Sequence, residues 1–294
     1  MSRKGVVLAA GLGTRLHPMT KAVNKQLIPV YDKPMIYYAL WVLLEAGVRD
    51  IMLVTSEDAR ESFVRLLGDG SRWGARIVCA VQPEPKGLVD AFMHAEDFIA
   101  GDPSMLVLGD NMFYGEGLAD MLHRAAARQE GATVFGARVK DPERFGVASF
   151  DANGRVLTLE EKPKQPKSDC AVVGLYFYDG RVMDYAKALR ARTDADKEVS
   201  ITDVNRMYME QGALSLNVFP EGFAWLDSGT HDSLLEAANF VAETQRRLGR
   251  MICCPEEAAW RQGFISAQKL REYGAADANN IYGRYLTQLF ESIQ

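Results

Sequence analysis

The first residues that could do chemistry lie in VVLAAGLGTRLHPMTKAVNKQLIPV, residues 6–30. A run of apolar residues leads into Gly11 and Gly13, and the cations Arg15 and Lys25 follow. Glycines let a backbone approach a ligand closely, and cations next to such a turn could neutralise phosphate charge. The stretch predicts a phosphate-binding loop. For the segment taken alone, the alternative is a simple glycine turn with a solvated arginine.

The spacing excludes two common phosphate loops. A P-loop needs GxxxxGK[ST], but Gly13 is followed by Thr14 and Arg15. A dinucleotide-binding loop needs GxGxxG, and Leu16 holds its third glycine position. Leucine is too bulky for the close helix–strand packing that this glycine serves. A glycine turn after a first buried strand is the interpretation that remains.

Two aspartates follow other predicted strands. Asp110 ends the run MLVLGDN, and Asp227 lies in WLDSGT. Open α/β sheets bind ligands at the carboxyl ends of their strands, so both aspartates are expected in one crevice with the glycine loop. One such aspartate alone would more often cap a helix or face solvent. Two of them beside a glycine loop and two cations indicate carboxylates that hold Mg²⁺ against phosphates.

The rest of the chain predicts the scaffold that positions these residues. Up to residue 131, apolar runs alternate with helical segments, which is typical of parallel strands with helices on both faces. Strands then follow one another closely, with a DANG turn at 151–154. Strands are expected at 5–11, 50–56, 76–82, 104–111, 132–139, 145–151, 155–163, 172–179, 213–219 and 223–230. Helices are expected at 34–48, 57–68, 87–98, 117–129, 180–191, 202–211 and 231–249.

These elements predict an α/β fold with a mixed, mostly parallel central sheet flanked by helices. We expect one main domain over 1–249 and a helical C-terminal annex over 250–294. A net charge of −5 gives no general basic face for nucleic acid, and no apolar run approaches the roughly 20 residues of a membrane span. The four cysteines lack CxxC or zinc-site spacing, which favours reduced thiols in a cytoplasmic protein.

Taken together, the segments resemble the sugar-1-phosphate nucleotidylyltransferases over about residues 1–290. The order and spacing of the motifs carry this resemblance: LAAGLGTRLHPMTKAVNKQLIPVYDKPMIYY, LLGDGSRWG, VQPEPKGL, LVLGDNMFYG, DPERFGV, LEEKP, GLYFYD, ITDVNRMY, AWLDSGTHDSLLEA and CPEE. The resemblance implies a Rossmann-like nucleotidyltransferase fold with a sugar-binding portion at about 132–230. It also implies Mg²⁺-dependent transfer of dTMP from dTTP to glucose-1-phosphate, the first step of dTDP-rhamnose synthesis, by a homotetramer.

The same resemblance assigns roles to individual residues. It implies catalytic roles for Arg15, Lys25 and Asp110, and metal binding by Asp110 and Asp227. It implies that the nucleotide is bound by Leu8, Gly11, Gly13, Thr14, Gln82 and Gly87. It implies that the sugar phosphate is bound by Gly146, Glu161, Lys162, Val172, Gly174 and Tyr176. No catalytic base is expected, because a sugar phosphate is already anionic near neutral pH.

Several positions depart from the family pattern. Leu12 replaces a serine of the first loop, and Phe145 replaces a tyrosine near the sugar pocket. Asp196 stands where the family has a phosphate-binding arginine, which Arg192 or Lys197 could replace. The departures keep two alternatives open: the same chemistry with UTP or another sugar-1-phosphate, and a non-catalytic protein that binds a sugar nucleotide and regulates a partner.

The resemblance also points to a second nucleotide site. Segments 114–123 and 250–261 match the regions that form it in family members. Arg261 lies in the second segment and would face the bound nucleotide. A solvated Arg261 is the alternative.

Overall fold

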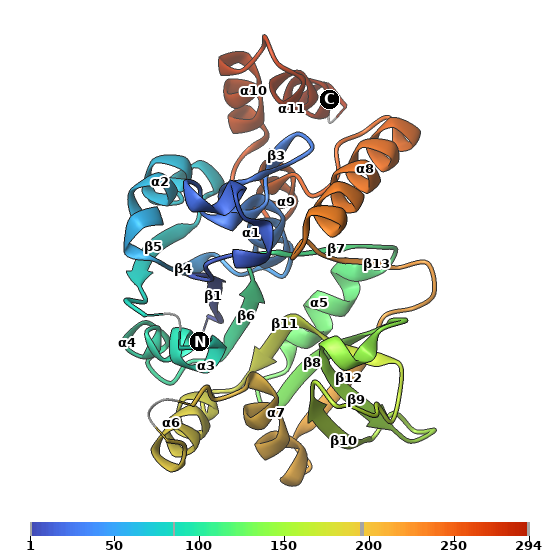
Figure 1. The fold of residues 1–294 in the computed structure, drawn as a ribbon. Helices are drawn as coiled ribbons and strands as arrows, with labels where there is room; N and C mark the ends of the chain where they lie inside the picture. The colour runs from blue at the N-terminus through green and yellow to red at the C-terminus, as the bar shows by residue number, and fades with distance from the viewer. Residues whose placement is uncertain (1, 85, 195–196, 293–294) are drawn as a thin grey trace.

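A computed structural model describes residues 2–84, 86–194 and 197–292 (Figure 1). The strands are β1 Lys4–Ala9, β2 Pro29–Val30, β3 Lys33–Pro34, β4 Asp50–Thr55, β5 Arg76–Val81, β6 Ser104–Leu108, β7 Asn111–Tyr114, β8 Ala132–Arg138, β9 Gly146–Phe150, β10 Val156–Glu161, β11 Cys170–Tyr178, β12 Leu214–Val218 and β13 Ala224–Asp227. The helices are α1 Ile36–Glu45, α2 Glu57–Leu67, α3 Leu88–Met93, α4 Glu96–Ile99, α5 Leu118–Ala127, α6 Val182–Arg192, α7 Ile201–Glu210, α8 His231–Leu248, α9 Pro255–Arg261, α10 Ala267–Ala276 and α11 Ile281–Glu291.

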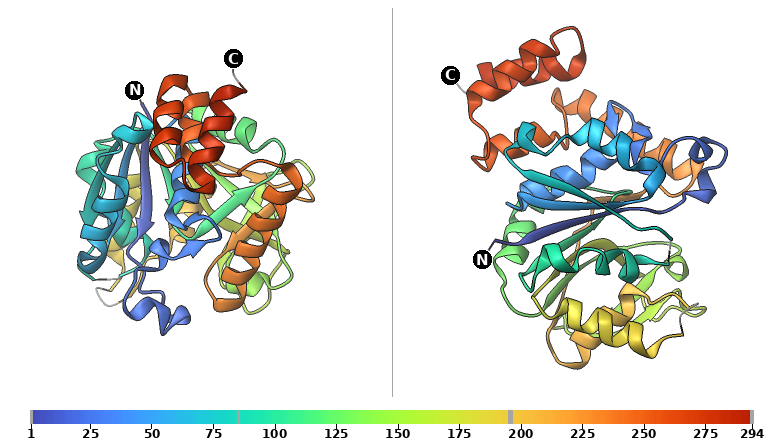
Figure 2. Two further views of the ribbon diagram at one scale, coloured as in Figure 1. Left: turned by 90° about the horizontal axis from the view of Figure 1, so that it is seen from above. Right: turned by 90° about the vertical axis from the view of Figure 1, so that its left-hand side faces the viewer.

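The parallel half of the central sheet is formed by β6, β1, β4 and β5 in that order. Both faces of β1 are buried, since Val7 belongs to the core under α1 and α2 and Val6 to the core on the opposite face. Helices cover both faces of these strands (Figure 2). A strand with two covered faces must be apolar throughout, which explains the uninterrupted apolar run of its sequence.

The other half of the sheet is built around β11. This strand pairs antiparallel with β6, β8 and β9, and β9 pairs with β10. β12 adds to β8 in parallel. At the predicted 151–154 turn, the Asp151 carboxylate accepts the backbone N–H groups of Asn153 and Arg155. The predicted α/β fold with a mixed sheet flanked by helices is confirmed.

Two expected elements are broken in the structure. The helix expected at 87–98 is divided into α3 and α4. The strand expected at 104–111 ends at Leu108, and β7 begins three residues later in a separate two-stranded ladder with β13. The turn between β6 and β7 is fixed by the Gly109 N–H, which donates to the Leu8 carbonyl at 3.0 Å. The break places Asp110 beyond the carboxyl end of β6.

The C-terminal helices all contribute to the core that contains α1. α9 supplies Ala258 and Ala259, and α10 and α11, which pack against each other at the top of Figure 1, supply the buried Leu270 and Leu286. Glu256 of α9 is fully buried and accepts hydrogen bonds from Arg72 Nε, at 2.6 Å, and from the Tyr282 hydroxyl of α11. This carboxylate therefore joins the C-terminal helices to the sheet domain. None of the described helices is long and apolar enough to cross a bilayer.

Candidate active site

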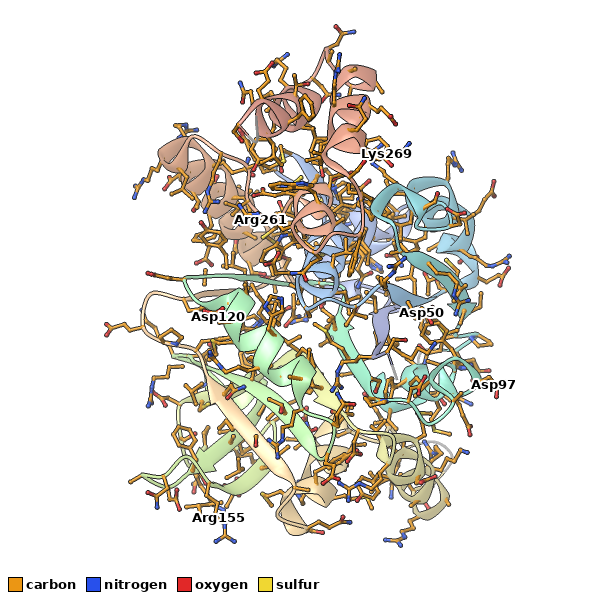
Figure 3. All side chains as sticks on the ribbon, turned by 180° about the vertical axis from the view of Figure 1, so that it is seen from behind. Asp50, Asp97, Asp120, Arg155, Arg261 and Lys269 are labelled. Carbon is orange, nitrogen blue, oxygen red and sulfur yellow. The ribbon has the colours of Figure 1, made fainter. Side chains whose placement is uncertain are left out.

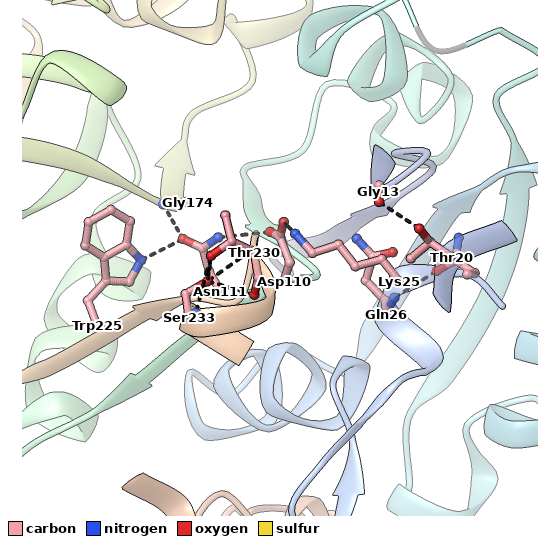
Figure 4. A network of polar contacts seen from close by, with 11 residues as sticks. Gly13, Thr20, Lys25, Gln26, Asp110, Asn111, Gly174, Trp225, Thr230 and Ser233 are labelled. Carbon is pink, nitrogen blue, oxygen red and sulfur yellow. Dashed lines mark hydrogen bonds and ion pairs between the residues drawn. The ribbon is translucent and has the colours of Figure 1, made fainter. Parts of the chain in front are cut away.

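The glycine loop follows the carboxyl end of β1 and is held by its own residues. Gly13 has a left-handed backbone with φ of 60°, and its carbonyl accepts the Thr20 hydroxyl at 2.7 Å. Asn24 donates to the Ala9 carbonyl at 3.0 Å and accepts the Gln26 N–H at 2.9 Å. These contacts fold the loop back over β1, so that Lys25 points toward Asp110 (Figure 4).

Lys25 and Asp110 form an ion pair in which the lysine is buried and the aspartate is partly exposed. The lysine is 5% exposed, and its Nζ contacts Asp110 Oδ2. Arg15 lies near Asp227, because a Cβ added to Gly229 would be 2.6 Å from an Arg15 terminal nitrogen and 3.2 Å from Asp227 Oδ1. The two cations of the loop thus accompany the two aspartates.

The β7–β13 ladder brings the two aspartates together. Asp227 pairs in register with Asn111, the residue after Asp110. Burial raises the pKa of Asp227, and the negative charge of Asp110 raises it further. The cations Lys25, Arg15 and Arg144 lower the same pKa in part. The two carboxylates are therefore close enough to act on each other, and together they offer oxygen ligands to one cation.

These carboxylates fit a divalent cation bound by few protein ligands. Among the described residues, no group of three or more histidine, cysteine, aspartate or glutamate side chains is arranged to hold a metal ion. Mg²⁺ prefers oxygen ligands and is commonly held by one or two carboxylates together with substrate phosphates. Asp110 and Asp227 match that donor set, and a zinc-type cage does not.

A cavity of about 300 Å³ opens beside the glycine loop; we refer to it as the loop cavity. Of the predicted nucleotide-binding residues, it is lined by Leu8, Gly11, Gln82 and Gly87, together with Asp110. Glu198 leans over Gly87 so closely that an added Cβ would meet its Cγ at 2.3 Å. Gly87 also has a φ of 100°, a conformation that residues other than glycine rarely adopt, so this backbone favours glycine at residue 87.

A second cavity, of about 480 Å³, lies between β9, β11 and β13; we refer to it as the strand cavity. It brings together all the predicted sugar-phosphate residues, namely Gly146, Glu161, Lys162, Val172, Gly174 and Tyr176, along with Arg15, Asp110 and Asp227. Asp110 and Glu198 line both cavities. The two spaces therefore meet at Asp110.

Lys162 is held in an unusual conformation at this site. Its φ of 43° lies in the left-handed region, which residues other than glycine rarely adopt. The Lys162 N–H donates to the Phe145 carbonyl at 2.9 Å and keeps the backbone there. Strain of this kind is often found where a side chain must be aimed at a ligand.

Some predicted residues lie elsewhere. Gly13 and Thr14 line neither cavity, and the Thr14 side chain is exposed on the first short turn of the loop. Asp196 lies outside the described residues. Arg192 and Lys197 line neither cavity, and Lys197 pairs with Asp194 at 2.7 Å.

Four further residues belong to the site by position. Gln26 lines the loop cavity, is 4% exposed, and its Oε1 has no hydrogen-bond partner in the structure. Arg144 and Asn111 line the strand cavity, and Glu198 lines both. Gln26, Asn111 and Arg144 lie inside the motifs of the sequence analysis, and Glu198 lies three residues before ITDVNRMY. Only the fold shows that these four side chains face the crevice.

A third cavity, of about 330 Å³, lies apart from these two; we refer to it as the rear cavity. Residues 114–119, 250–253, 257, 258 and 261 contribute most of its lining, so both predicted segments meet there. Figure 3 shows Arg261 on α9 and Asp120 on α5 from behind. The Arg261 guanidinium pairs with Glu257 at 2.6 Å, and about half of its side chain is exposed. A second nucleotide site in this cavity stays a prediction.

Comparisons with known proteins agree with this geometry. The sequence profile of the family described as nucleotidyl transferase matches residues 4–244. A glucose-1-phosphate thymidylyltransferase from Xanthomonas campestris pv. campestris is 55% identical over 287 residues, which cover 98% of this chain and 97% of the relative. One from Neisseria meningitidis is 54% identical over 288 residues, covering 98% and 99%.

A solved structure supports the same relationship. A Bacillus anthracis protein in complex with sucrose superposes with a TM-score of 0.75 at 39% sequence identity, covering 81% of this chain and 95% of that chain. The α/β sheet and the paired cavities thus define a nucleotide-transferring class of protein. The chain belongs to the nucleotidyl transferase family, among the glucose-1-phosphate thymidylyltransferases, which confirms the resemblance carried by its motifs.

Proposed function

We propose that this protein transfers dTMP from dTTP to glucose-1-phosphate, giving dTDP-glucose and pyrophosphate. The observation that carries the proposal is that Asp110 lines both the loop cavity and the strand cavity. A nucleotide in the first and a sugar phosphate in the second would bring their phosphates together beside Arg15, Lys25 and Asp227. The reaction would supply the first step of dTDP-rhamnose synthesis.

The loop cavity suits a pyrimidine that carries an imide N–H. Gln82 Nε2 donates to Asp90 Oδ2 at 2.9 Å, which leaves the amide oxygen of Gln82 as the atom available to a ligand. A carbonyl acceptor matches the N3–H donor of thymine or uracil. The apolar residues Leu8, Leu88 and Leu108 offer contacts to a 5-methyl group. Burying one methyl contributes about 0.8 kcal/mol, or about a fourfold preference for thymine.

The strand cavity suits a hexose phosphate. Glu161 supplies a carboxylate acceptor for sugar hydroxyl groups, and Lys162 and Arg144 supply cations for the phosphate. In the reaction, a phosphate oxygen of glucose-1-phosphate attacks the α-phosphorus of dTTP. The new phosphorus–oxygen bond forms as the bond to the β-phosphate breaks, and pyrophosphate leaves with the electron pair. No general base is needed because the attacking oxygen is already charged.

Arg15 and Lys25 have the positions required to act on the departing charge. Cations fixed in advance stabilise charge that grows in the transition state more than they stabilise the bound substrate. Asp110 and Asp227 would hold Mg²⁺, which would supply further charge neutralisation at the phosphates. The remaining contribution of the protein is to hold the two phosphates in line.

The experiment that tests this function is a pyrophosphate-release screen. dTTP and UTP are each supplied with a panel of sugar-1-phosphates and Mg²⁺. Release should be fastest for dTTP with glucose-1-phosphate. A preference for UTP above tenfold would replace the thymidylyl assignment by the uridylyl alternative, and binding of dTDP-glucose without turnover in either direction would favour the non-catalytic alternative.

Three broader properties belong to the same proposal. We propose a cytoplasmic enzyme, supported by four free cysteines, of which Cys170, Cys253 and Cys254 are buried. We propose a homotetramer, for which the exposed apolar side chains Leu235 and Leu248 on α8 are candidate contacts. Sedimentation velocity would measure the oligomeric state.

The division of the chain also stays a proposal: a domain over 1–249, with its sugar-binding portion at 132–230, and an annex over 250–294.

A further inference from the structure

Asn111 is the residue that connects the strand cavity to the candidate metal ligand Asp110. It is 3% exposed and lies at the start of β7, between Asp110 and the β13 ladder. Figure 4 shows its side chain between the Trp225 indole and the Asp110 carboxylate. The family resemblance gave this side chain no role.

The orientation of the Asn111 amide follows from its partners. Oδ1 accepts the Trp225 Nε1–H at 2.8 Å and the Gly174 backbone N–H at 3.0 Å. An indole N–H and a backbone N–H are donors only, so the atom that meets both must be the amide oxygen. The amide nitrogen is consequently turned toward Asp110.

That nitrogen donates to Asp110 Oδ1 at 3.0 Å, while Lys25 Nζ contacts the other oxygen, Oδ2. Both oxygens of the carboxylate therefore have a partner, and rotation about the Cβ–Cγ bond would break two contacts. A carboxylate fixed in this way loses less conformational freedom when it binds a ligand than one that turns freely.

Gly174 makes this connection possible. A Cβ at this position would lie 2.7 Å from Asn111 Oδ1 and 2.6 Å from Leu108 Cγ, so any larger residue would push the amide away. The strand β11 can bring its N–H to Asn111 only because the side chain is absent. The glycine in the GLYFYD motif thus has a physical reason that concerns Asp110 as well as the strand cavity.

We propose that Asn111 is a positioning residue for Asp110: held at its oxygen by Trp225 and Gly174, it fixes the orientation in which Asp110 receives the divalent cation. The inference rests on the proposed function, which makes Asp110 a metal ligand. Trp225 then has two roles, since its ring lines the strand cavity while its N–H sets the geometry of the metal site. A change on the sugar side of the crevice is thereby transmitted to the metal ligand through one amide.

Direct metal binding tests the inference without turnover. Mn²⁺ alone is titrated into the full chain and the free ion is measured by electron paramagnetic resonance. Asn111→Ala should raise the Mn²⁺ dissociation constant about tenfold. Trp225→Phe keeps most of the ring and removes only the N–H, and it should raise the constant about threefold. Phe145→Leu is the matched control: Phe145 packs against the Trp225 ring, with 5.1 Å between centroids, but has no part in the hydrogen bonds, so Mn²⁺ affinity should stay the same.

The steady-state readout separates positioning from simple sugar contact. Asn111→Ala and Trp225→Phe should raise the Mg²⁺ concentration for half-maximal rate in parallel with the Mn²⁺ constant. The inference is overturned if folded Asn111→Ala and Trp225→Phe proteins both bind Mn²⁺ within twofold of the wild type, whatever their KM for glucose-1-phosphate. Failure of the proposed function would instead appear as a wild-type protein that binds Mn²⁺ and releases no pyrophosphate.

Discussion

Thr202 Oγ1 donates a hydrogen bond of 2.6 Å to Glu161 Oε2, and Ser200 adds a second donor to the same oxygen at 3.2 Å. Ser200 also caps the N-terminus of α7, where its hydroxyl accepts the Thr202 N–H at 3.1 Å. The start of one helix therefore orients the carboxylate on β10 that faces the strand cavity. Glu161 Oε1, with Lys162 Nζ at 3.7 Å, is left to meet a ligand.

Removing the Thr202 hydroxyl should weaken sugar-phosphate binding. Thr202→Val keeps the shape and deletes a hydrogen bond to a charged group, so KM for glucose-1-phosphate should rise about tenfold with a smaller change in kcat. Thr202→Ser retains the hydroxyl and should stay within about twofold of wild type. Initial rates over a range of glucose-1-phosphate decide the matter. Equal KM values for the valine and serine variants would contradict this role.

Arg15 should act mainly on the rate of transfer. If its contact strengthens as charge moves to the leaving pyrophosphate, Arg15→Ala should lower kcat by about 100-fold or more. Arg15→Lys keeps the charge without the planar guanidinium and should recover part of the rate. Single-turnover pyrophosphate release measures this step. A rise in KM for dTTP with an unchanged kcat would reduce Arg15 to a binding residue.

Asp227→Asn should abolish activity and stabilise the metal-free protein at neutral pH. The pKa of Asp227 is raised on folding, so the folded chain binds more protons than the unfolded chain above the usual carboxyl pKa. The folded protein therefore loses stability as the pH rises from the usual carboxyl pKa through the raised pKa of Asp227. Asparagine does not titrate in this range, so Asp227→Asn removes this loss. Each kcal/mol recovered should raise Tm by about 2–4 °C in differential scanning calorimetry.

The pH dependence and a second variant check this prediction. The gain from Asp227→Asn should disappear at a pH below the ordinary carboxyl range, where both forms are uncharged. Asp110→Asn is the matched comparison and should lower Tm, because it leaves the buried Lys25 without its partner. A neutral-pH Tm for Asp227→Asn below that of the wild type would show that this carboxylate is not destabilising.

Arg144 should serve the phosphate of the sugar substrate. It lines the strand cavity, and its charge acts on Asp227, whereas Arg192 lines neither active-site cavity. Arg144→Ala should raise KM for glucose-1-phosphate about tenfold. Arg192→Ala should change it by less than twofold. The reverse order of effects would make Arg192 the replacement for the arginine that the family has at residue 196.

The sequence predicts the scaffold well because apolar residues follow different spacings along buried strands and along helices. It also predicts that Asp110 and Asp227 meet, since the strand-end rule depends only on topology. It does not show that β6 stops at Leu108, because the run MLVLGDNMFY is apolar on both sides of the break. β6 ends where its pairing with β1 ends, after Leu108 and the Gly109 N–H on the Leu8 carbonyl, and no local pattern records the end of that tertiary pairing.

The finer parts of the site depend on which way side chains turn. Gln26 and Asn111 lie inside the motifs, next to Lys25 and Asp110, yet polar side chains beside a functional residue usually face solvent, so spacing alone does not select them. Thr14 shows the opposite case, because its motif position suggested a contact and the short turn exposes it. The direction of a side chain on a regular strand therefore follows more directly from the sequence than that of a side chain on the loop.

The meeting of the loop and strand cavities at Asp110 also affects how the reaction ends. Under the proposed function each substrate would fill one space, whereas a nucleoside diphosphate joined to a hexose would extend through both and keep the contacts of each. The sugar-nucleotide product should therefore have the largest contact surface in the crevice. Accumulated dTDP-glucose should compete with dTTP and with glucose-1-phosphate alike, so the forward flux should depend on how quickly a following enzyme withdraws it.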